Sequence, residues 1–320
     1  MPILDLPLEQ LYQYQGRNPR PDDFDNYWAR ALAELDQTPA NHELIPNHTL
    51  KTVNAECFDL WFTGVRGARI HAKFLRPKHA NGKLPAALQF HGYGGNAGDW
   101  ADKLSYVNQG YCIAAMDCRG QGGSSQDTGN VKGPTRLGHV VRGLEDHPDN
   151  LLFRHIFLDT AQLARIVLSM PEVDANNVVA FGGSQGGALT IACAALEPRI
   201  RKAAPVYPFL SDYLRVWEMD QAKDAYEDIT QYFRIFDPRH ERKDEVFRTL
   251  GYIDIQNLAP RIRAEVLMFT GLMDSICPPS SQFAAYNKMT CKKQVHIYPD
   301  FRHEGLPQSS DLIFNFLTGN

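Results

Sequence analysis

The 320-residue sequence predicts an α/β domain in which a mostly parallel sheet carries helices on both faces. From Leu84 onward, short apolar segments of strand length alternate with stretches that have helical spacing, as covered parallel sheets require. Hydrophobic residues make up 43% of the chain and charged residues 22%, which allows a large core. No repeat or linker divides the chain, so we expect a single domain over residues 1–320.

Residues 1–50 are expected to form an N-terminal helical extension. The stretch DDFDNYWARALAELDQ has the pattern of an amphipathic helix that starts at Asp22 or Asp23 and places Phe24 and Trp28 on one apolar face. A β-hairpin is expected next, because two segments with strand-like composition, ECFDLWFTG and ARIHAKFLRP, flank a turn at residues 64–67.

The alternating part of the chain contains five expected strands and one long helix. The helix covers residues 156–170, where Ile156, Leu163 and Val167 share a face. A segment from about residue 207 to residue 250 interrupts the alternation with aromatic and charged residues, so we expect a helical insertion over the sheet edge. The strands are expected at residues 86–90, 111–117, 178–182, 264–271 and 293–299.

Composition excludes several classes of protein. The formal net charge of -4, without any Lys/Arg-rich run, argues against a nucleic-acid partner. No apolar run approaches the roughly 18 residues that span a bilayer, and the N-terminus lacks the basic-then-apolar pattern of a signal peptide. The six cysteines contain no C-x-x-C pair, which favours reduced thiols. We therefore expect a cytoplasmic protein without a membrane partner.

A single serine stands between two pairs of glycines where a strand is expected to meet a helix. Residues 182–186 fit the pattern G-x-S-x-G, with an apolar strand before them and the helical stretch GALTIACAAL after them. Glycines suit a sharp strand-to-helix turn, and the N–H of Gln185 at the helix N-terminus can stabilise an oxyanion. The alternative is a glycine-rich turn with a solvated serine. We favour Ser184 as a nucleophile.

A nucleophilic serine needs a histidine base. With this type of turn the residues follow in the order serine, acid, histidine, and both partners lie in loops after later strands. Three histidines follow Ser184 in the chain. His303 lies in the loop after the last expected strand, whereas His296 lies inside that strand and His240 in a polar segment. We therefore expect His303 to be the base.

The acid is expected at Asp274, in the loop after the strand at residues 264–271. Asp300 is close to His303 in sequence, and Asp254 precedes the strand rather than following it, so both are weaker candidates. A turn or helix cap is the other interpretation of Asp274. A metal site is not expected, because the chain has neither H-E-x-x-H nor paired Cys/His spacing.

A second oxyanion donor is expected after an early strand. The segment LQFHGYGGNAGDW places a glycine-rich turn there, and the backbone N–H of Tyr93 is the best candidate donor. His91 in the same turn is expected to be a packed, hydrogen-bonded imidazole rather than a catalytic one.

Several motifs together resemble the acetyl xylan esterase and cephalosporin-C deacetylase group, carbohydrate esterase family 7. The likeness covers almost the whole chain, including its N-terminal stretch DLPLEQLYQYQGRNPRPDDFDNYW and VRGLEDHPD near Arg142. The motifs that carry it are Arg119-Gly120-Gln121, GGSQGG around Ser184, GLMDSICPPS around Asp274, FAAYN at residues 283–287 and His303-Glu304.

The resemblance implies an α/β-hydrolase fold with Ser184, Asp274 and His303 as catalytic trio and with Tyr93 and Gln185 as oxyanion donors. It also implies a serine esterase that needs no cofactor, removes acetyl groups from small carbohydrates and cephalosporins, and forms hexamers with inward-facing active sites. Two departures concern substrate preference: Asn150–Phe153 replaces a tyrosine run, and Gly305–Pro307 follows Glu304.

The Arg-Gly-Gln stretch has no evident chemical role. We expect Arg119 to pair with Glu304 or another carboxylate and to hold the His303 loop. The functional alternatives are another small-acyl esterase, a lipase-like enzyme or a peptidase on the same fold, and a non-catalytic binding relative. The charged insertion argues against a lipase lid, and retention of all three candidate catalytic residues argues against a binding relative.

Overall fold

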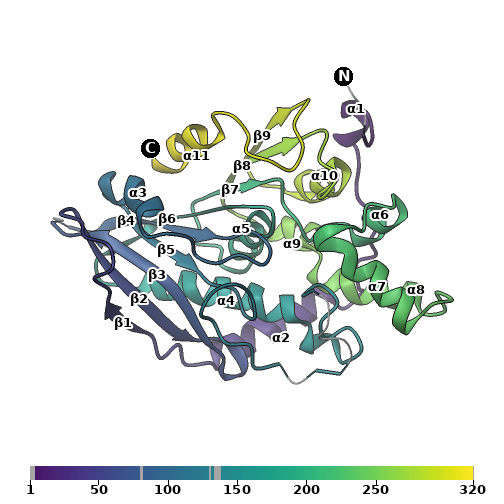
Figure 1. Ribbon diagram of the computed structural model, residues 1–320, viewed down its shortest axis with the longest axis horizontal. Helices are drawn as coiled ribbons and strands as arrows, with labels where there is room; N and C mark the ends of the chain where they lie inside the picture. The colour runs from purple at the N-terminus through teal and green to yellow at the C-terminus, as the bar shows by residue number, and fades with distance from the viewer. Residues whose placement is uncertain (1–3, 80–81, 130, 133–137, 320) are drawn as a thin grey trace.

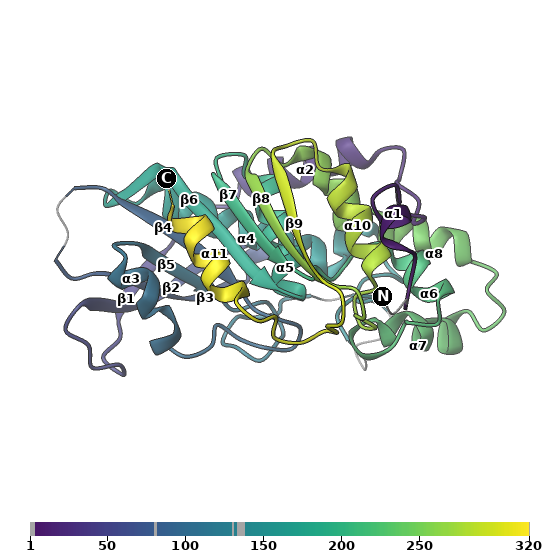
Figure 2. The ribbon, with the colours of Figure 1, turned by 90° about the horizontal axis from the view of Figure 1, so that it is seen from above.

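The computed structural model describes residues 4–79, 82–129, 131–132 and 138–319 and has a nine-stranded sheet at its centre (Figures 1 and 2). The strand order is β1-β2-β3-β5-β4-β6-β7-β8-β9. The strands are β1 (Glu43–Pro46), β2 (Ala55–Thr63), β3 (Arg69–Pro77), β4 (Leu84–Phe90), β5 (Cys112–Met116), β6 (Val173–Gly183), β7 (Lys202–Val206), β8 (Glu265–Gly271) and β9 (Lys293–Tyr298).

The direction of the strands divides the sheet into two parts. β1, β2 and β3 pair antiparallel, and β3 also pairs antiparallel with β5. From β5 to β9 each neighbouring pair is parallel. The carboxyl ends of these six strands therefore lie at one edge, where parallel α/β sheets place their functional loops. The predicted α/β architecture with a mostly parallel sheet is confirmed.

Helices cover both faces of the sheet, which explains why its central strands are apolar throughout (Figure 2). All five residues of β5 are buried. One face carries α2 (Phe24–Asp36), α4 (Leu152–Ser169) and α5 (Gln185–Leu196), and their side chains form the largest core cluster. The other face carries α3 (Leu104–Asn108) and α11 (Ser309–Thr318), which form a second cluster with side chains from that side of the strands.

Further helices lie towards the β9 side of the molecule. Between β7 and β8 the chain forms α6 (Tyr213–Glu218), α7 (Glu227–Phe236), α8 (Lys243–Leu250) and α9 (Ile255–Leu258), of which the first three project from the sheet in Figure 1. α10 (Pro279–Lys288) follows β8 and packs against α1 (Leu8–Leu11). No helix among the described residues is long and apolar enough to cross a membrane.

Some local expectations need correction. α4 begins at Leu152, four residues before the predicted start, because Leu152 and Phe153 are buried and continue its packed surface. Asp23 takes the cap position of α2 but makes no capping bond, since its carboxylate accepts a hydrogen bond from the Tyr252 hydroxyl instead. Two strands were not predicted. β1 is short and mostly exposed, and β7 contains a proline.

Candidate active site

Ser184 lies at the junction between β6 and α5, in a backbone conformation that few residues other than glycine adopt. Its φ is 58° and its ψ is -119°. The neighbouring glycines are required by close approach. A Cβ on Gly182 would lie 2.5 Å from the carbonyl oxygen of Phe90, and one on Gly186 would lie 2.1 Å from it. The turn is therefore compressed against the end of β4, and the serine is the one side chain that projects from it.

Ser184, His303 and Asp274 form a continuous hydrogen-bonded chain. Ser184 Oγ lies 2.9 Å from Nε2 of His303, and Nδ1 of the same ring lies 2.8 Å from Oδ2 of Asp274. A carboxylate can only accept, so Nδ1 carries the proton and Nε2 is free to accept from the serine hydroxyl. The structure brings together the three residues that the sequence predicted, although they come from three separate loops.

Asp274 is fully buried after β8, and its charge is compensated locally. Its Oδ1 accepts hydrogen bonds from the backbone N–H groups of Ile276, at 2.9 Å, and Cys277, at 2.8 Å. Its Oδ2 faces the imidazole of His303. Because a buried carboxylate is costly unless it is hydrogen-bonded, this arrangement keeps Asp274 fixed as the partner of one imidazole nitrogen.

The other histidines and aspartates that were candidates for the base and the acid have different contacts. His296 stacks on Phe269 within the sheet, with ring centroids 5.1 Å apart, and His240 packs against Trp217 and Phe233. Asp254 is buried and caps α9 through the N–H of Gln256. Asp300 is exposed in the turn after β9.

Two backbone N–H groups are available as oxyanion donors. Among the described residues, neither the N–H of Tyr93 nor that of Gln185 has an acceptor. Gln185 opens α5, so its N–H belongs to the free donors at a helix N-terminus, where an anion is stabilised. His91 in the same loop as Tyr93 accepts from the N–H of Cys118 at 3.0 Å, which confirms it as a structural imidazole.

The Tyr93 side chain is held from two directions. Its hydroxyl accepts from the N–H of His139 at 2.8 Å and donates to Oδ2 of Asp228 at 3.4 Å. Asp228 also accepts from the N–H of Val140 at 3.1 Å, and burial raises the pKa of its carboxyl to about 6. Asp228 lies in the first turn of α7, so the insertion contacts the loop that carries one candidate oxyanion donor.

Gln121 connects the loop that carries Tyr93 to the side chain of Gln185, a role that the sequence did not predict. Its Oε1 accepts from the N–H of Gly94 at 2.9 Å and from Nε2 of Gln185 at 3.0 Å, while its own Nε2 lies 2.8 Å from Oε1 of Gln185. The Gln185 side chain is fully buried beneath the serine turn. The signal in the sequence was the Arg-Gly-Gln motif itself, which does not indicate which residues Gln121 would contact.

Arg119 does not pair with Glu304. Its guanidinium forms a buried, two-bond pair with Asp159 of α4, at 2.5 and 2.7 Å, and donates to the carbonyl of Val65. Glu304 is exposed and accepts from the N–H of Arg302 within the His303 loop. Arg119 therefore fixes the loop after β5 to α4, and Gly120 beside it needs glycine because its φ is +63°.

Cys277 lies beside the chain of three residues. Its thiol and single ligand atoms of Asp274 and His303 lie within 4.8 Å of one another. Burial raises the pKa of the Cys277 thiol well above its ordinary value. A metal would need the thiolate and would break the bond between Asp274 and His303, so the cluster suits acid–base chemistry better than metal binding.

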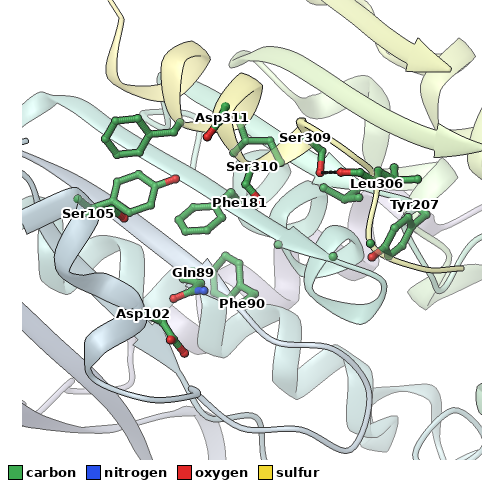
Figure 3. Close-up of a pocket in the computed structure, with 17 residues that line it drawn as sticks. Gln89, Phe90, Asp102, Ser105, Phe181, Tyr207, Leu306, Ser309, Ser310 and Asp311 are labelled. Atoms are coloured by element: carbon green, nitrogen blue, oxygen red, sulfur yellow. Dashed lines mark hydrogen bonds between the residues drawn. The ribbon is translucent and has the colours of Figure 1, made fainter. Parts of the chain in front are cut away.

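A cleft of about 690 Å³ begins beside the serine turn and runs between α3 and α11 (Figure 3). At the active-site end it is lined by Gly183, which precedes Ser184, and by Tyr207, whose ring lies 4.4 Å from the imidazole of His303. Gly305 and Leu306 also line it, so one of the two sequence departures falls at this cleft. The other departure, Asn150–Phe153, leads into α4.

Comparisons with known proteins agree with this geometry. A family model described as acetyl xylan esterase (AXE1) matches residues 1–320. The crystal structure of acetyl xylan esterase 1 from Thermoanaerobacterium sp. JW/SL YS485 is 58% identical with a TM-score of 0.97, covering 98% of this chain and 99% of that one. The acetyl xylan esterase structure from Paenibacillus sp. R4 is 36% identical with a TM-score of 0.93, covering 98% and 99%.

A curated relative is more distant. The acetyl esterase Axe7A of Xylanibacter ruminicola is 28% identical over 291 residues, which cover 88% of this chain. The chain spans 63% of the length of that relative. The solved structures, by contrast, match along nearly their entire length and share the α/β-hydrolase architecture described above.

Proposed function

Because the chain belongs to the acetyl xylan esterase family, we propose that it is a serine esterase that removes acetyl groups from small acetylated carbohydrates such as xylo-oligosaccharides. The same site is proposed to accept cephalosporin-type acetyl esters. The observation that carries this proposal is the hydrogen-bonded chain from Ser184 through His303 to Asp274. The N–H groups of Tyr93 and Gln185, which have no acceptor among the described residues, support it.

In the proposed reaction, Nε2 of His303 takes the proton of Ser184 as Oγ attacks the acetyl carbonyl. The N–H groups of Tyr93 and Gln185 hold the developing oxyanion, and Asp274 stabilises the imidazolium. His303 then donates its proton to the leaving alcohol, which breaks the ester bond and leaves an acetyl group on Ser184. In the second half, His303 activates water, which attacks the acetyl-enzyme and releases acetate and the free serine.

Hydrolysis of p-nitrophenyl acetate, butyrate and octanoate tests this function. We expect the wild type to prefer acetate, and Ser184→Ala to lose nearly all turnover while its melting temperature stays close to normal. Ser169→Ala is the matched control, because Ser169 is exposed at the end of α4, which lies on the opposite face of the sheet from α3 and α11, and donates to the Ile166 carbonyl. It should keep full activity.

Other outcomes would replace the proposal. A preference for octanoate would indicate a lipase-like enzyme. Folded wild type without turnover of any ester would indicate a peptidase or a binding protein. Activity retained by Ser184→Ala would exclude Ser184 as the nucleophile.

A further inference from the structure

Gln282 lies in the first turn of α10, and its side-chain amide contacts the proposed catalytic acid. The side chain is fully buried. Its Nε2 lies 3.4 Å from Oδ2 of Asp274 and 2.6 Å from the carbonyl oxygen of Cys277. Oδ2 is also the atom that accepts from Nδ1 of His303, at 2.8 Å. One carboxylate oxygen is therefore shared between the imidazole and the Gln282 amide.

The orientation of the Gln282 amide follows from its neighbours. A carboxylate oxygen and a backbone carbonyl oxygen can only accept hydrogen bonds, so the end of the amide that faces them must be the NH2 group. The other end, Oε1, is buried and has no donor among the residues that the structure describes. Since a buried acceptor without a donor costs free energy, Gln282 stabilises the fold less than a fully bonded side chain would.

The contacts of the Asp274 carboxylate explain what this amide can do. Its Oδ1 accepts from two backbone N–H groups, those of Ile276 and Cys277. Its Oδ2 accepts from the imidazole of His303, which exchanges protons during the proposed reaction, and from Gln282. The amide is thus the contact on Oδ2 that stays in place while the imidazole changes its charge. It keeps the carboxylate from turning away.

The helix that carries Gln282 is fixed at its N-terminus. The N–H of Ser280 donates to Oδ2 of Asp5 at 2.7 Å, and Arg215 of α6 pairs with the other oxygen of Asp5 at 2.8 Å. The Asp5 side chain is only 1% exposed. α10 also packs against β8, the strand that precedes Asp274. The amide and the carboxylate are therefore held by the same packed elements, as the positioning of a reacting group requires.

We propose that Gln282 is a positioning residue for the esterase reaction, and that its amide keeps Oδ2 of Asp274 directed at Nδ1 of His303. This inference rests on the proposed function, because it concerns the imidazole that acts as base and acid in that reaction. The amide also takes up part of the negative charge on Oδ2, so the carboxylate holds the imidazolium proton less tightly. An unpaired buried acceptor is the kind of local cost that proteins carry at functional sites.

The test is Gln282→Met, which keeps an unbranched side chain of similar length and removes both polar ends. The melting temperature should stay close to that of the wild type. The substitution removes one unpaired acceptor, Oε1, and deprives the Cys277 carbonyl of its contact, so the two effects oppose each other. For p-nitrophenyl acetate, kcat per active site should fall about tenfold with little change in KM, the effect of one net hydrogen bond to a charged group. Titration with a fluorophosphonate counts the active sites.

The pH profile separates positioning from a purely structural effect. A carboxylate with one donor fewer attracts the imidazolium proton more strongly, so the half-maximal point of kcat/KM should move to higher pH by about half a unit. This point does not depend on how much of the protein is folded, so it stays informative if Gln282→Met folds incompletely. In an Asp274→Asn background, Gln282→Met should lower kcat by less than about twofold, because the two residues act as one unit.

The matched control is Gln162→Met. Gln162 is a buried glutamine of α4 whose Nε2 donates to the carbonyl of Thr38 at 3.2 Å. This control should lower the melting temperature without changing kcat or the pH profile. Normal kcat in folded Gln282→Met, or a lower kcat with an unchanged pH profile, would overturn the positioning role and leave the esterase function standing. Wild type that hydrolyses no acetyl ester would instead refute the function itself.

Discussion

At the scale of single residues, the chain of Ser184, His303 and Asp274 could be predicted because each residue type leaves a local signal. Glycines marked the turn, and the order of strands and loops singled out one histidine and one aspartate. The partners of Arg119 and Gln121 left no such signal. Asp159 lies 40 residues from Arg119 on a helix, and Gln121 bonds to a residue 64 positions away. Only the folded chain brings these groups together.

Arg119→Ala should lower stability more than it lowers the turnover of the protein that remains folded. The substitution leaves the buried carboxylate of Asp159 without its partner, which costs about 3–5 kcal/mol. Urea unfolding and active-site-normalised turnover measure the two effects. Normal unfolding combined with lost activity would contradict a structural role for Arg119.

Gln121→Ala should affect both stability and catalysis. It leaves the buried Oε1 of Gln185 without its hydrogen-bond donor, at a cost of about 1–3 kcal/mol, and frees the N–H of Gly94 in the loop that carries Tyr93. Losing one oxyanion donor costs roughly 3 kcal/mol, so a displaced donor should lower kcat by about tenfold with little change in KM. Steady-state kinetics on p-nitrophenyl acetate separate the two constants. A rise in KM at constant kcat would contradict this account.

At the scale of elements, the strands that are buried on both faces were predicted well, because an unbroken apolar run is their signature. β1 and β7 were not predicted, and the reason differs between the two strands. β1 is an exposed edge strand that pairs only with β2, and β7 carries Pro205 inside a five-residue strand. The contact between α7 and the Tyr93 loop could not be predicted either, since it joins segments 135 residues apart.

We expect that contact to make Asp228 a positioning residue for Tyr93, the candidate oxyanion donor. Asp228→Asn should lower kcat about tenfold while KM changes little, because it weakens the hold on the Tyr93 hydroxyl and on the N–H of Val140. Combining it with Tyr93→Phe should add little further loss. Asp237→Asn is the control. Asp237 is buried at the other end of α7, and its carboxylate accepts hydrogen bonds from the N–H groups of Glu241 and Arg242 instead. An equal loss of kcat in both aspartate variants would mean that any disturbance of the helical insertion lowers activity, which would contradict a specific role for Asp228.

At the scale of the whole molecule, two cores on opposite faces of one sheet support a site at the carboxyl edge of its strands. The buried carboxyl groups of Asp254 and Asp212 connect the N-terminal segment to the rest of the domain. Asp254 bonds to the N–H of Asp212, whose carboxylate accepts from the N–H groups of Arg17 and Asn18. Burial, and then the charge of Asp212, raises the pKa of Asp254 to about 7.

The contribution of Asp254 to stability should therefore fall as pH rises. The folded state holds a proton on Asp254 that the unfolded chain releases above about pH 4, so its stabilising effect is lost as pH rises towards 7. Between pH 5 and pH 8 the wild type should lose roughly 2–3 kcal/mol relative to Asp254→Asn. Urea unfolding of both proteins at the two pH values measures the difference. If the difference in the free energy of unfolding between wild type and variant does not change with pH, the raised pKa of Asp254 is contradicted.

In the proposed reaction, Ser184 carries the acetyl group between the two halves of the reaction. The most direct measurement is peptide mass spectrometry of enzyme quenched in acid during the first turnover of p-nitrophenyl acetate. We predict one added acetyl group on the peptide that contains Ser184, and none in His303→Ala or Ser184→Ala. An acetyl group on another residue, or turnover without any acetylated peptide, would contradict the mechanism.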